Sequence, residues 1–498
     1  MGTIIQTIHD IGNLLGQKMY ADAFSMTTGL LSDTIYTYLL IPLLLGIGIF
    51  YTFKIKGGQI TNIGHAIKLI SKPAEDKNSI SPFKAFTISA ASHIGTGNIV
   101  GVAAAVSIGG PGAVFWMWVT ALIGGASSFV ENTLGQVFKE RNPDGTFKGG
   151  PAFYMEKALG KPKLAALFSV VIAVVYGINF NAMQANTIAA GFNSSFGLDK
   201  KIVALVLIIL AGLIIFGGLR RIADVTSLLV PFMAIIYMAV VLFIVIKNIA
   251  LIPHMFGLIF EGAFSLKAGF GGLFGTAILN GIRRGLFSNE AGMGAVPNAS
   301  AVADVSHPAK QGLIQALGVY LDTILVCSAT AFVVILSGEG IYASDLKGLE
   351  ITQAALANEV GSWSNYFLTF CVLMFAFSSI VGNYYYGENN ILKLNFGKNA
   401  LNIYRVIVLI AVILGCVGDF SIVWNTGDVF MGIMAVINLV VLIFLGKISV
   451  GVYNDYMKQL KEGKDPVFNP EDVKELKPYL DKICLLYTSD AADDAPRV

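Results

Sequence analysis

Apolar runs of about 20 residues recur along nearly the whole chain, and they restrict the fold more than any other feature. A run of that length is what a helix needs to cross a hydrocarbon layer of roughly 30 Å. Because the bilayer core offers the backbone no hydrogen-bond partners, only helices and closed barrels span it. Charged residues make up 13% of the chain, about half their share in soluble domains. The sequence therefore predicts an all-α, polytopic membrane protein.

The apolar runs predict about eleven spanning segments. They are expected at 33–53, 82–108, 110–136, 164–192, 201–217, 222–246, 268–304 (broken), 308–336, 364–392, 401–416 and 421–446. A shorter apolar stretch near 250–264 predicts an interfacial helix, and 349–360 predicts a similar surface segment. Residues 1–30 lack the basic start and apolar core of a cleavable signal peptide, so the first span is expected to direct insertion.

These segments predict a single membrane domain over 33–446, preceded by an extracytoplasmic segment over 1–32. A cytoplasmic tail is expected over 447–484. The last stretch, "LLYTSDAADDAPRV" (485–498), resembles translated vector sequence, and we expect it to be an artefact.

Lysine and arginine are distributed unevenly between alternate loops. One set of loops, which includes 54–84 and 137–163, holds about seventeen basic residues, and the other set holds about six. Basic loops stay on the cytoplasmic side of a membrane. The chain is therefore expected to have its amino terminus outside and its carboxyl terminus in the cytoplasm.

The stretch "SHIGTGNIVG" (92–101) places three glycines, a threonine and an asparagine inside an apolar segment. Backbone groups freed there cost several kcal/mol each unless a cavity or a ligand satisfies them. A break near Gly95 would present a positive helix end to a carboxylate and a carbonyl end to a cation or an ammonium group. A glycine-rich helix-packing face is the alternative explanation.

A second interrupted stretch, "GIRRGLFSNEAGMGAVPNAS" (281–300), favours the break over the packing face. The two breaks open two sets of five helices, at 82–246 and 268–446, and 33–53 is then an extra helix in front. Interrupted helices at matching positions of two halves are typical of transporters built from inverted repeats. The odd number of helices in each half gives the halves opposite topology.

Three stretches carry a resemblance to a known family: "SHIGTGNIVGVAAAVSIGGPGAVFWMWVTALIGG", "KGGPAFYME" and "GIRRGLFSNEAGMGAVPNASA". They resemble the alanine or glycine:cation symporters of prokaryotes, and the likeness spans roughly 80–450. The resemblance implies a LeuT-type 5+5 fold whose first and sixth core helices are broken. It also implies sodium-driven uptake of alanine or glycine across a prokaryotic cell membrane. Sodium is then a co-transported ion, with no cofactor, no nucleic acid and no obligate protein partner expected.

The resemblance further implies a sodium site between the first break and the eighth core helix. Its expected ligands are carbonyls near Ala91 and Ile94 and the hydroxyls of Ser378 and Ser379. Two adjacent serines in an apolar helix also commonly bond back to the preceding helical turn, which is the alternative.

For the amino acid, Thr96, Gly97 and Asn98 are expected to meet the carboxylate, and the segment holding Ala291, Gly292 and Gly294 to help bind the ammonium group. These assignments follow from the resemblance. The remaining candidates are amides in apolar surroundings: Asn181, Gln184 and Asn383. Asn181 and Gln184 share one helical face, and buried amides also serve as bonds between helices. Asn383 departs from the tryptophan expected there in some relatives, which bears on whether substrates larger than alanine enter.

Charged residues inside the apolar segments are costly and normally pair or face a polar cavity. For Arg283, Arg284 and Glu290 we expect an ion-pair network that stabilises the second break, and for Asp322 either that network or proton relay. Glu131 and Glu388 are expected to be gate or packing residues.

Two other classes of membrane protein compete with a transporter. An intramembrane enzyme needs a nucleophile with its base or a metal-ligand cluster, and a channel needs a filter loop or a ring of pore charges. No HExxH, GxSxG or paired-carboxylate pattern occurs. A symporter for another cation or another small solute on the same fold remains the principal alternative, and an enzyme comes after it.

Overall fold

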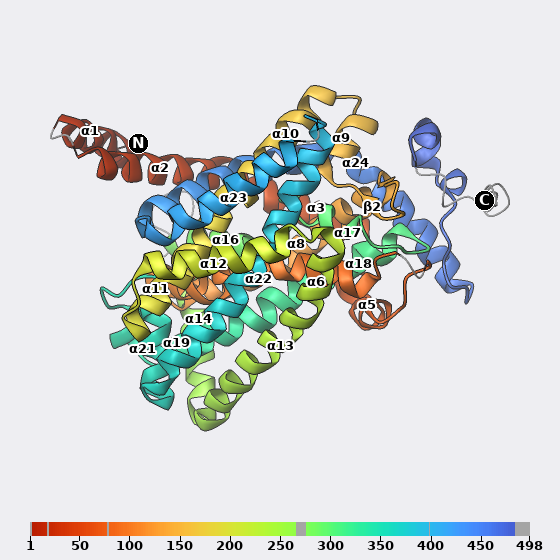
Figure 1. Cartoon of the computed structure of the whole chain (residues 1–498). Helices are drawn as coiled ribbons and strands as arrows, with labels where there is room; N and C mark the ends of the chain where they lie inside the picture. Colours follow the sequence, from red (N-terminus) through yellow and green to blue (C-terminus); the bar gives the residue numbers. More distant parts are fainter. Residues whose placement is uncertain (1, 17–18, 77–78, 265–274, 398, 484–498) are drawn as a thin grey trace.

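A computed structural model describes residues 2–16, 19–76, 79–264, 275–397 and 399–483. The described chain is almost entirely helical, with one short antiparallel hairpin formed by β1 (Glu140–Arg141) and β2 (Phe147–Lys148). Figure 1 shows the amino-terminal helices α1 (Gly2–Gly16) and α2 (Tyr20–Ile35) at one end of the molecule. The carboxyl-terminal segment lies at the opposite end.

Within the described residues, eight helices are long and apolar enough to cross a membrane, and a bent pair makes nine. The eight are Tyr20–Lys54, Gly112–Val137, Pro162–Phe196, Gly218–Lys247, Pro308–Leu336, Trp363–Leu394, Ala400–Val417 and Phe420–Lys461. The difference from the expected eleven lies in two shorter helices, α12 (Lys200–Ile215) and α16 (Thr276–Asn289). The expected broken segment 268–304 falls partly outside the described residues, and the expected artefact at 485–498 falls wholly outside them.

Several boundaries differ from the predictions. The first long helix, built from α2, η1 (Tyr36–Leu40) and α3 (Ile41–Lys54), begins at Tyr20 and not near 33. The last helix, α24 (Phe420–Lys461), continues well past 446. Polar residues occur on both extensions, so a hydropathy pattern that stops at the apolar run underestimates these helices.

The helix α21 (Leu349–Val360) matches the predicted range, but it is not a surface segment. Half of its residues are buried, and the Thr352 hydroxyl donates a hydrogen bond to the Ile99 carbonyl at 3.3 Å. Its sequence shows no strong amphipathic face, so the pattern alone gave no sign that α21 packs against an interrupted helix.

Both predicted interruptions are present. The first separates α6 (Pro82–His93) from η2 (Gly97–Gly101) and α7 (Val102–Gly109), and the chain bends by 50° there. The second follows α16, where residues 290–296 are non-helical before α17 (Pro297–Ser300). The two interruptions pack together, because α16 contacts both η2 and α7.

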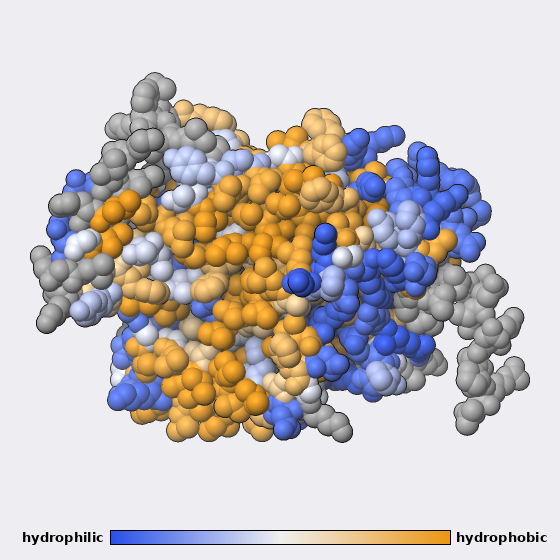
Figure 2. All heavy atoms as spheres, turned by 90° about the horizontal axis from the view of Figure 1, so that it is seen from above, coloured by the Kyte–Doolittle hydropathy of each residue, from blue (hydrophilic) through white to orange (hydrophobic). Residues whose placement is uncertain are grey.

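Hydrophobic side chains cover the middle of the face in Figure 2, and hydrophilic residues gather toward the end that carries the carboxyl-terminal segment. Large apolar side chains are exposed along α12, α13 (Gly218–Lys247) and α23 (Ala400–Val417). Leu228 and Ile235 of α13 are 76% and 69% exposed. An outward apolar surface of this kind suits contact with lipid, as a multi-pass membrane protein requires.

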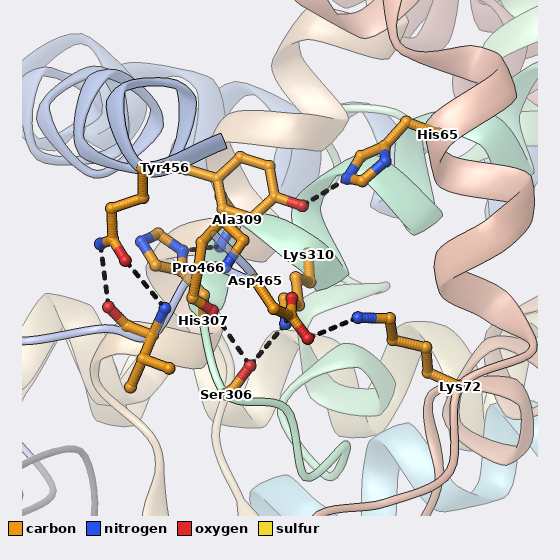
Figure 3. Close-up of polar contacts among 11 residues, drawn as sticks. His65, Lys72, Ser306, His307, Ala309, Lys310, Tyr456, Asp465 and Pro466 are labelled. Atoms are coloured by element: carbon orange, nitrogen blue, oxygen red, sulfur yellow. Dashed lines mark hydrogen bonds and ion pairs between the residues drawn. The ribbon is translucent and has the colours of Figure 1, made fainter. Parts of the chain in front are cut away.

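The segment after α24 folds back over the loop that precedes α18 (Pro308–Tyr320), as Figure 3 shows. The Asp465 carboxylate lies 2.7 Å from Lys310 Nζ and 2.6 Å from Lys72 Nζ. The Phe468 N–H donates to the Ser306 carbonyl at 2.8 Å, and the Phe468 side chain is fully buried. The tail thus fastens the region after the second broken helix to the segment before the first.

Two ionisable groups in this tail contact have shifted pKa values. Partial burial alone would raise the pKa of Asp465, but the hydrogen bonds from Lys310 and Lys72 outweigh it and hold the pKa below its ordinary value. Burial lowers the pKa of His307, and its contact with Asp455 at 3.2 Å offsets this only in part. His307 is therefore neutral at pH 7 and makes a hydrogen bond with Asp455, not an ion pair.

Candidate functional site between the two broken helices

The first break is held open by side-chain acceptors. The Gly95 N–H donates to Asn98 Oδ1 at 2.8 Å, and the Thr96 N–H donates to Gln184 Oε1 at 3.1 Å. In a continuous helix these two N–H groups would bond to the carbonyls of Ala91 and Ser92. Both carbonyls have therefore lost their helical donors inside the protein, where a cation or an ammonium group is a suitable replacement.

Gly97 lies against the other broken helix. A Cβ atom built on Gly97 would lie 2.9 Å from the ring of Phe287, on α16. The close approach that Gly97 permits is thus to Phe287 of the other broken helix. The neighbouring Thr96 hydroxyl is buried and has no hydrogen-bond partner among the described residues. A polar atom in that condition is a candidate contact for a solute.

A buried carboxylate holds the second break. Glu131 of α8 (Gly112–Val137) accepts hydrogen bonds from the Gly292 N–H at 3.1 Å, the Gly294 N–H at 2.9 Å and Asn438 Nδ2 at 2.8 Å. Both glycines have φ near +80°, a conformation that other residues rarely adopt. Of the two roles expected for Glu131, gate or packing residue, these contacts favour packing. The backbone N–H groups of Gly292 and Gly294 are already bonded to this side chain.

The rest of the second break also exposes carbonyl groups. The Ala291 N–H donates to Asn289 Oδ1 at 3.1 Å, and the Gly292 N–H is bonded to Glu131. In a continuous helix these N–H groups would bond to the carbonyls of Phe287 and Ser288. The predicted ammonium contact at this segment therefore has free carbonyls at Phe287 and Ser288, whereas the Gly292 carbonyl accepts a hydrogen bond from Asn438 at 2.9 Å.

Asp322 connects the two breaks. It lies in η5 (Leu321–Cys327), in the middle of a spanning helix, and is fully buried. Its Oδ1 accepts a hydrogen bond from Asn98 Nδ2 at 2.6 Å, and its Oδ2 accepts one from the Thr323 hydroxyl at 3.0 Å. Thr323 also accepts a bond from Asn289 Nδ2 at 3.0 Å. Among the described residues no basic side chain pairs with this carboxylate, so its charge, when present, needs a cation or a proton from outside the protein.

The expected ion pairs form at the two arginines of the second broken helix, but they do not include Glu290, and that part of the prediction is wrong. Arg283 pairs with Asp33 at 2.6 Å and Arg284 pairs with Asp428 at 2.5 Å, so both arginines hold carboxylates on other helices. Neither reaches Glu290. On a helix, side chains six and seven residues apart are separated by almost two turns, which makes direct pairing across the end of α16 difficult.

The two predicted sodium-binding serines face different ways. A Cβ built on Gly95 would lie 2.3 Å from Ser379 Oγ, so Ser379 adjoins the first break. Ser378 instead lies 3.5 Å from the Met233 sulfur, on α13. Both hydroxyls bond back to the Phe375 carbonyl, which was the alternative explanation for the pair. Ser379 thus lies beside the end of α6, where the Ala91 carbonyl has lost its helical donor. Ser378 does not lie there.

The three candidate amides are buried, but they differ in their contacts. Gln184 is bonded to the first break, as described above. Asn383 Oδ1 lies 2.6 Å from the hydroxyl of Ser92, at the end of α6, and Asn383 Nδ2 has no partner among the described residues. Asn181 makes only a long bond of 3.4 Å to the Gly177 carbonyl within its own helix. Gln184 and Asn383 therefore adjoin the breaks, whereas no bond links Asn181 to them.

A hollow lies between α11 (Asn181–Phe196), α21 and the loop before α24. This cavity has a volume of about 460 Å³, which is large enough for a small solute. Its lining includes Thr187, which is one helical turn along α11 from Gln184, the residue that bonds to the first break. The residues of the break itself do not line it.

Comparison of the sequence with known proteins identifies the family of the chain. The model of the sodium:alanine symporter family matches residues 21–470. The chain belongs to the sodium:alanine symporter family. Among its relatives are two proteins of Bacillus subtilis (strain 168). The probable sodium/glutamine symporter GlnT is 46% identical over 90% of this chain and 93% of its own. The amino-acid carrier protein AlsT is 46% identical over 91% of this chain and 97% of its own.

A solved structure has a related fold. A mutant of the manganese transporter of Eremococcus coleocola aligns over 83% of this chain and 94% of its own, with a TM-score of 0.50 and 11% identity. The likeness concerns the fold alone. Membership of the symporter family, together with the apolar helices, makes the protein a multi-pass membrane transporter for cation-coupled amino-acid symport.

Sequence reasoning missed the partners that hold the second break. Asn438 links Glu131 to the Gly292 carbonyl, and the Tyr154 hydroxyl donates to Asn438 Oδ1 at 2.6 Å. The available signal was the presence of Glu131 and Asn438 inside apolar helices, since a polar side chain at that depth normally has a structural or functional partner. The identity of that partner depends on tertiary contacts across more than a hundred residues of sequence.

Proposed function

We propose that this protein couples sodium entry to the uptake of a small neutral amino acid, alanine or glycine, by alternating access. The proposal rests chiefly on one observation: two broken helices meet at a buried centre, and their freed carbonyls and unpartnered polar atoms face that centre. The family name and the resemblance to LeuT-type transporters support sodium and alanine as the coupled pair. In this account the 5+5 repeat rocks around the two breaks.

The substrate carboxylate is proposed to bind at Thr96, Gly97 and Asn98, where the second half of the first broken helix begins. The positive end of that half favours an anion, and the Thr96 hydroxyl supplies a free polar group. Gln184 and Asn383 adjoin this position and are proposed to help bind the substrate. Asn181 is also proposed as a substrate contact, although no hydrogen bond links it to the breaks. At the segment that holds Ala291, Gly292 and Gly294, the carbonyls of Phe287 and Ser288 that have lost their helical donors are proposed to help hold the ammonium group.

The sodium ion is proposed to bind between the end of α6 and Ser379. Sodium prefers hard oxygen ligands, and the freed carbonyl of Ala91 together with Ile94 and the Ser379 hydroxyl offers them. Ser378 remains the weaker member of the predicted set because its hydroxyl lies against Met233. We propose that the tail lies in the cytoplasm and the amino terminus outside, because basic loops favour the cytoplasmic side. The cavity near α21 is then the entrance from outside.

A symporter that uses another cation is the second candidate, and Asp322 favours it. A fully buried carboxylate without a basic partner binds a proton as readily as it binds a metal ion. Under that alternative Asp322 carries the coupled proton between the two breaks.

Uptake by purified protein in liposomes tests the proposal. With an inward sodium gradient, labelled alanine or glycine is expected to accumulate above its external concentration, and with potassium in place of sodium it is not. Glutamine belongs in the substrate panel because a relative is named for it. Equal uptake in potassium driven by an inward proton gradient would remove sodium from the mechanism. Absence of uptake for every small amino acid would remove the substrate class.

A further inference from the structure

Glu290 is the one polar residue at the breaks whose conformation, burial and contacts are all unusual. It follows the end of α16 with φ of 55°, a left-handed conformation that is uncommon outside glycine, and its side chain is 1% exposed. Such a conformation is unfavourable for a residue with a Cβ atom. A conformation of this kind at a buried position often marks a functional constraint.

The Glu290 carboxylate has no positive partner among the described residues. The two arginines that are near it in sequence pair with carboxylates on other helices. No lysine, arginine or histidine nitrogen forms an ion pair with Glu290 in the part of the chain that the structure describes. Removing a carboxylate from water without a partner costs several kcal/mol. A positive group from outside the chain would offset that cost.

The contacts of Glu290 leave one oxygen available. Oε1 lies 3.1 Å from the hydroxyl of Ser92, which has one proton and also lies 2.6 Å from Asn383 Oδ1. Oε2 is buried and makes no hydrogen bond of ordinary geometry among the described residues, although the Tyr176 hydroxyl lies close to the carboxylate. The other carboxylates at the breaks differ, because Glu131 and Asp322 each receive hydrogen bonds at both oxygens. Glu290 is therefore the carboxylate at the breaks with an oxygen free to accept a bond.

The surroundings of Glu290 supply further oxygens. Tyr176 and Tyr386 lie close to the carboxylate, and their hydroxyls are buried without a hydrogen bond of ordinary geometry among the described residues. The carbonyls of Ser288 and Ser92, on either side, have lost their helical donors as shown above. An ammonium group has three N–H donors and no acceptor, so it matches a site made of a carboxylate, carbonyls and hydroxyls.

From this geometry we infer that Glu290 binds the ammonium group of the amino-acid substrate. The inference rests on the proposed function and assigns a charged residue to the same site. Glu290 lies against the hydroxyl of Ser92, which is about one turn from the proposed carboxylate contacts at Thr96 and Gly97. In an α-amino acid the ammonium group and the carboxylate are attached to the same carbon atom. The substrate therefore places its carboxylate at the positive helix end and its ammonium group against Glu290.

Ligand binding to the purified protein tests the inference. Glu290→Gln keeps the side chain's shape and removes its charge, and Glu388→Gln is the control, since Glu388 is a buried carboxylate paired with Arg405. At saturating sodium, Glu290→Gln is expected to raise the Kd for alanine about 10- to 100-fold, the fold-change of one charge-assisted hydrogen bond. The control is expected to bind alanine like the wild type. Sodium binding in the absence of alanine is expected to be unchanged in both.

A second ligand makes the test specific for the ammonium group. Lactate has a hydroxyl where alanine has its ammonium group. The wild type is expected to prefer alanine over lactate strongly, and Glu290→Gln is expected to lose most of that preference. A general structural defect would weaken both ligands alike and would contradict the inference.

Three other outcomes would overturn the inference. If Glu290→Gln binds alanine as tightly as the wild type does, Glu290 does not hold the ammonium group. A loss of pH dependence in that variant would then mean that Glu290 holds a proton, and an unchanged pH dependence would mean that it holds neither. A weaker sodium affinity measured without alanine would make Glu290 a sodium ligand. If the wild type binds neither alanine, glycine nor glutamine, the proposed function fails first, and this result is distinct from a variant that matches an active wild type.

Discussion

Replacing Glu131 is expected to destabilise the second break in a graded way. Glu131→Ala leaves three buried donors without this acceptor: the Gly292 N–H, the Gly294 N–H and one N–H of Asn438 Nδ2. Each unsatisfied buried group costs about 1–3 kcal/mol, so the loss is about 3–9 kcal/mol. Glu131→Gln keeps one oxygen and turns an amide NH2 toward the other N–H, for a loss of about 1–3 kcal/mol. Because native proteins are stable by only about 5–15 kcal/mol, the alanine variant should be close to unfolding.

Unfolding of the purified protein in mixed micelles at increasing SDS content measures this series. The expected order of stability is wild type, then Glu131→Gln, then Glu131→Ala. Tyr154→Phe, which removes the bond to Asn438, should lose about 1 kcal/mol. Glu388→Gln is the control for removal of a buried carboxylate away from the breaks. If Glu131→Gln and Glu131→Ala unfold together with the wild type, Glu131 does not hold the second break.

Four further results are expected. Ser379→Ala should raise the sodium concentration for half-maximal uptake about tenfold at saturating alanine, and a larger effect on alanine affinity would reassign the serine. Gly97→Val should insert normally but lose transport, since its Cβ meets Phe287 at 2.9 Å; normal transport would refute the close approach. Asp465→Asn should speed proteolysis of the tail at most about fivefold, because the Asp465 side chain is 62% exposed and the buried Lys310 keeps its hydrogen bond to the Ser306 hydroxyl. Proteolysis of the wild-type tail should become faster as the pH falls below about 6.5. Burial lowers the pKa of His307, so this residue takes up a proton more readily when the tail is released, and low pH favours release. Equal rates of tail proteolysis at pH 5.5 and 7.5 would contradict this.

The apolar pattern predicted the helices well, and the places where it failed have physical reasons. The range 308–336 agrees with the observed Pro308–Leu336 helix, and both interruptions occur where glycine and polar residues cluster. Hydropathy reports the lipid-facing length and says little about polar helix ends. The first and last long helices therefore extend beyond their predicted limits, at Tyr20 and Lys461.

The candidate site was predicted less completely, because its partners come from distant parts of the chain. Sequence adjacency favoured pairing of Glu290 with Arg283 and Arg284, yet both arginines pair with residues more than a hundred positions away. The backbone N–H of Gly292 likewise has its acceptor, Glu131, 161 residues earlier. Local pattern identifies where the backbone is interrupted, whereas only the packed structure shows which side chain satisfies it.

We expect bound solutes to stabilise the interrupted backbone at mid-membrane depth. An experimental structure of the protein with sodium and alanine tests this expectation most directly. The account predicts alanine density between residues 95–98 and 288–294, with a sodium ion beside Ser379. Continuous helices through these residues, or alanine bound elsewhere with the gap closed by protein, would contradict it.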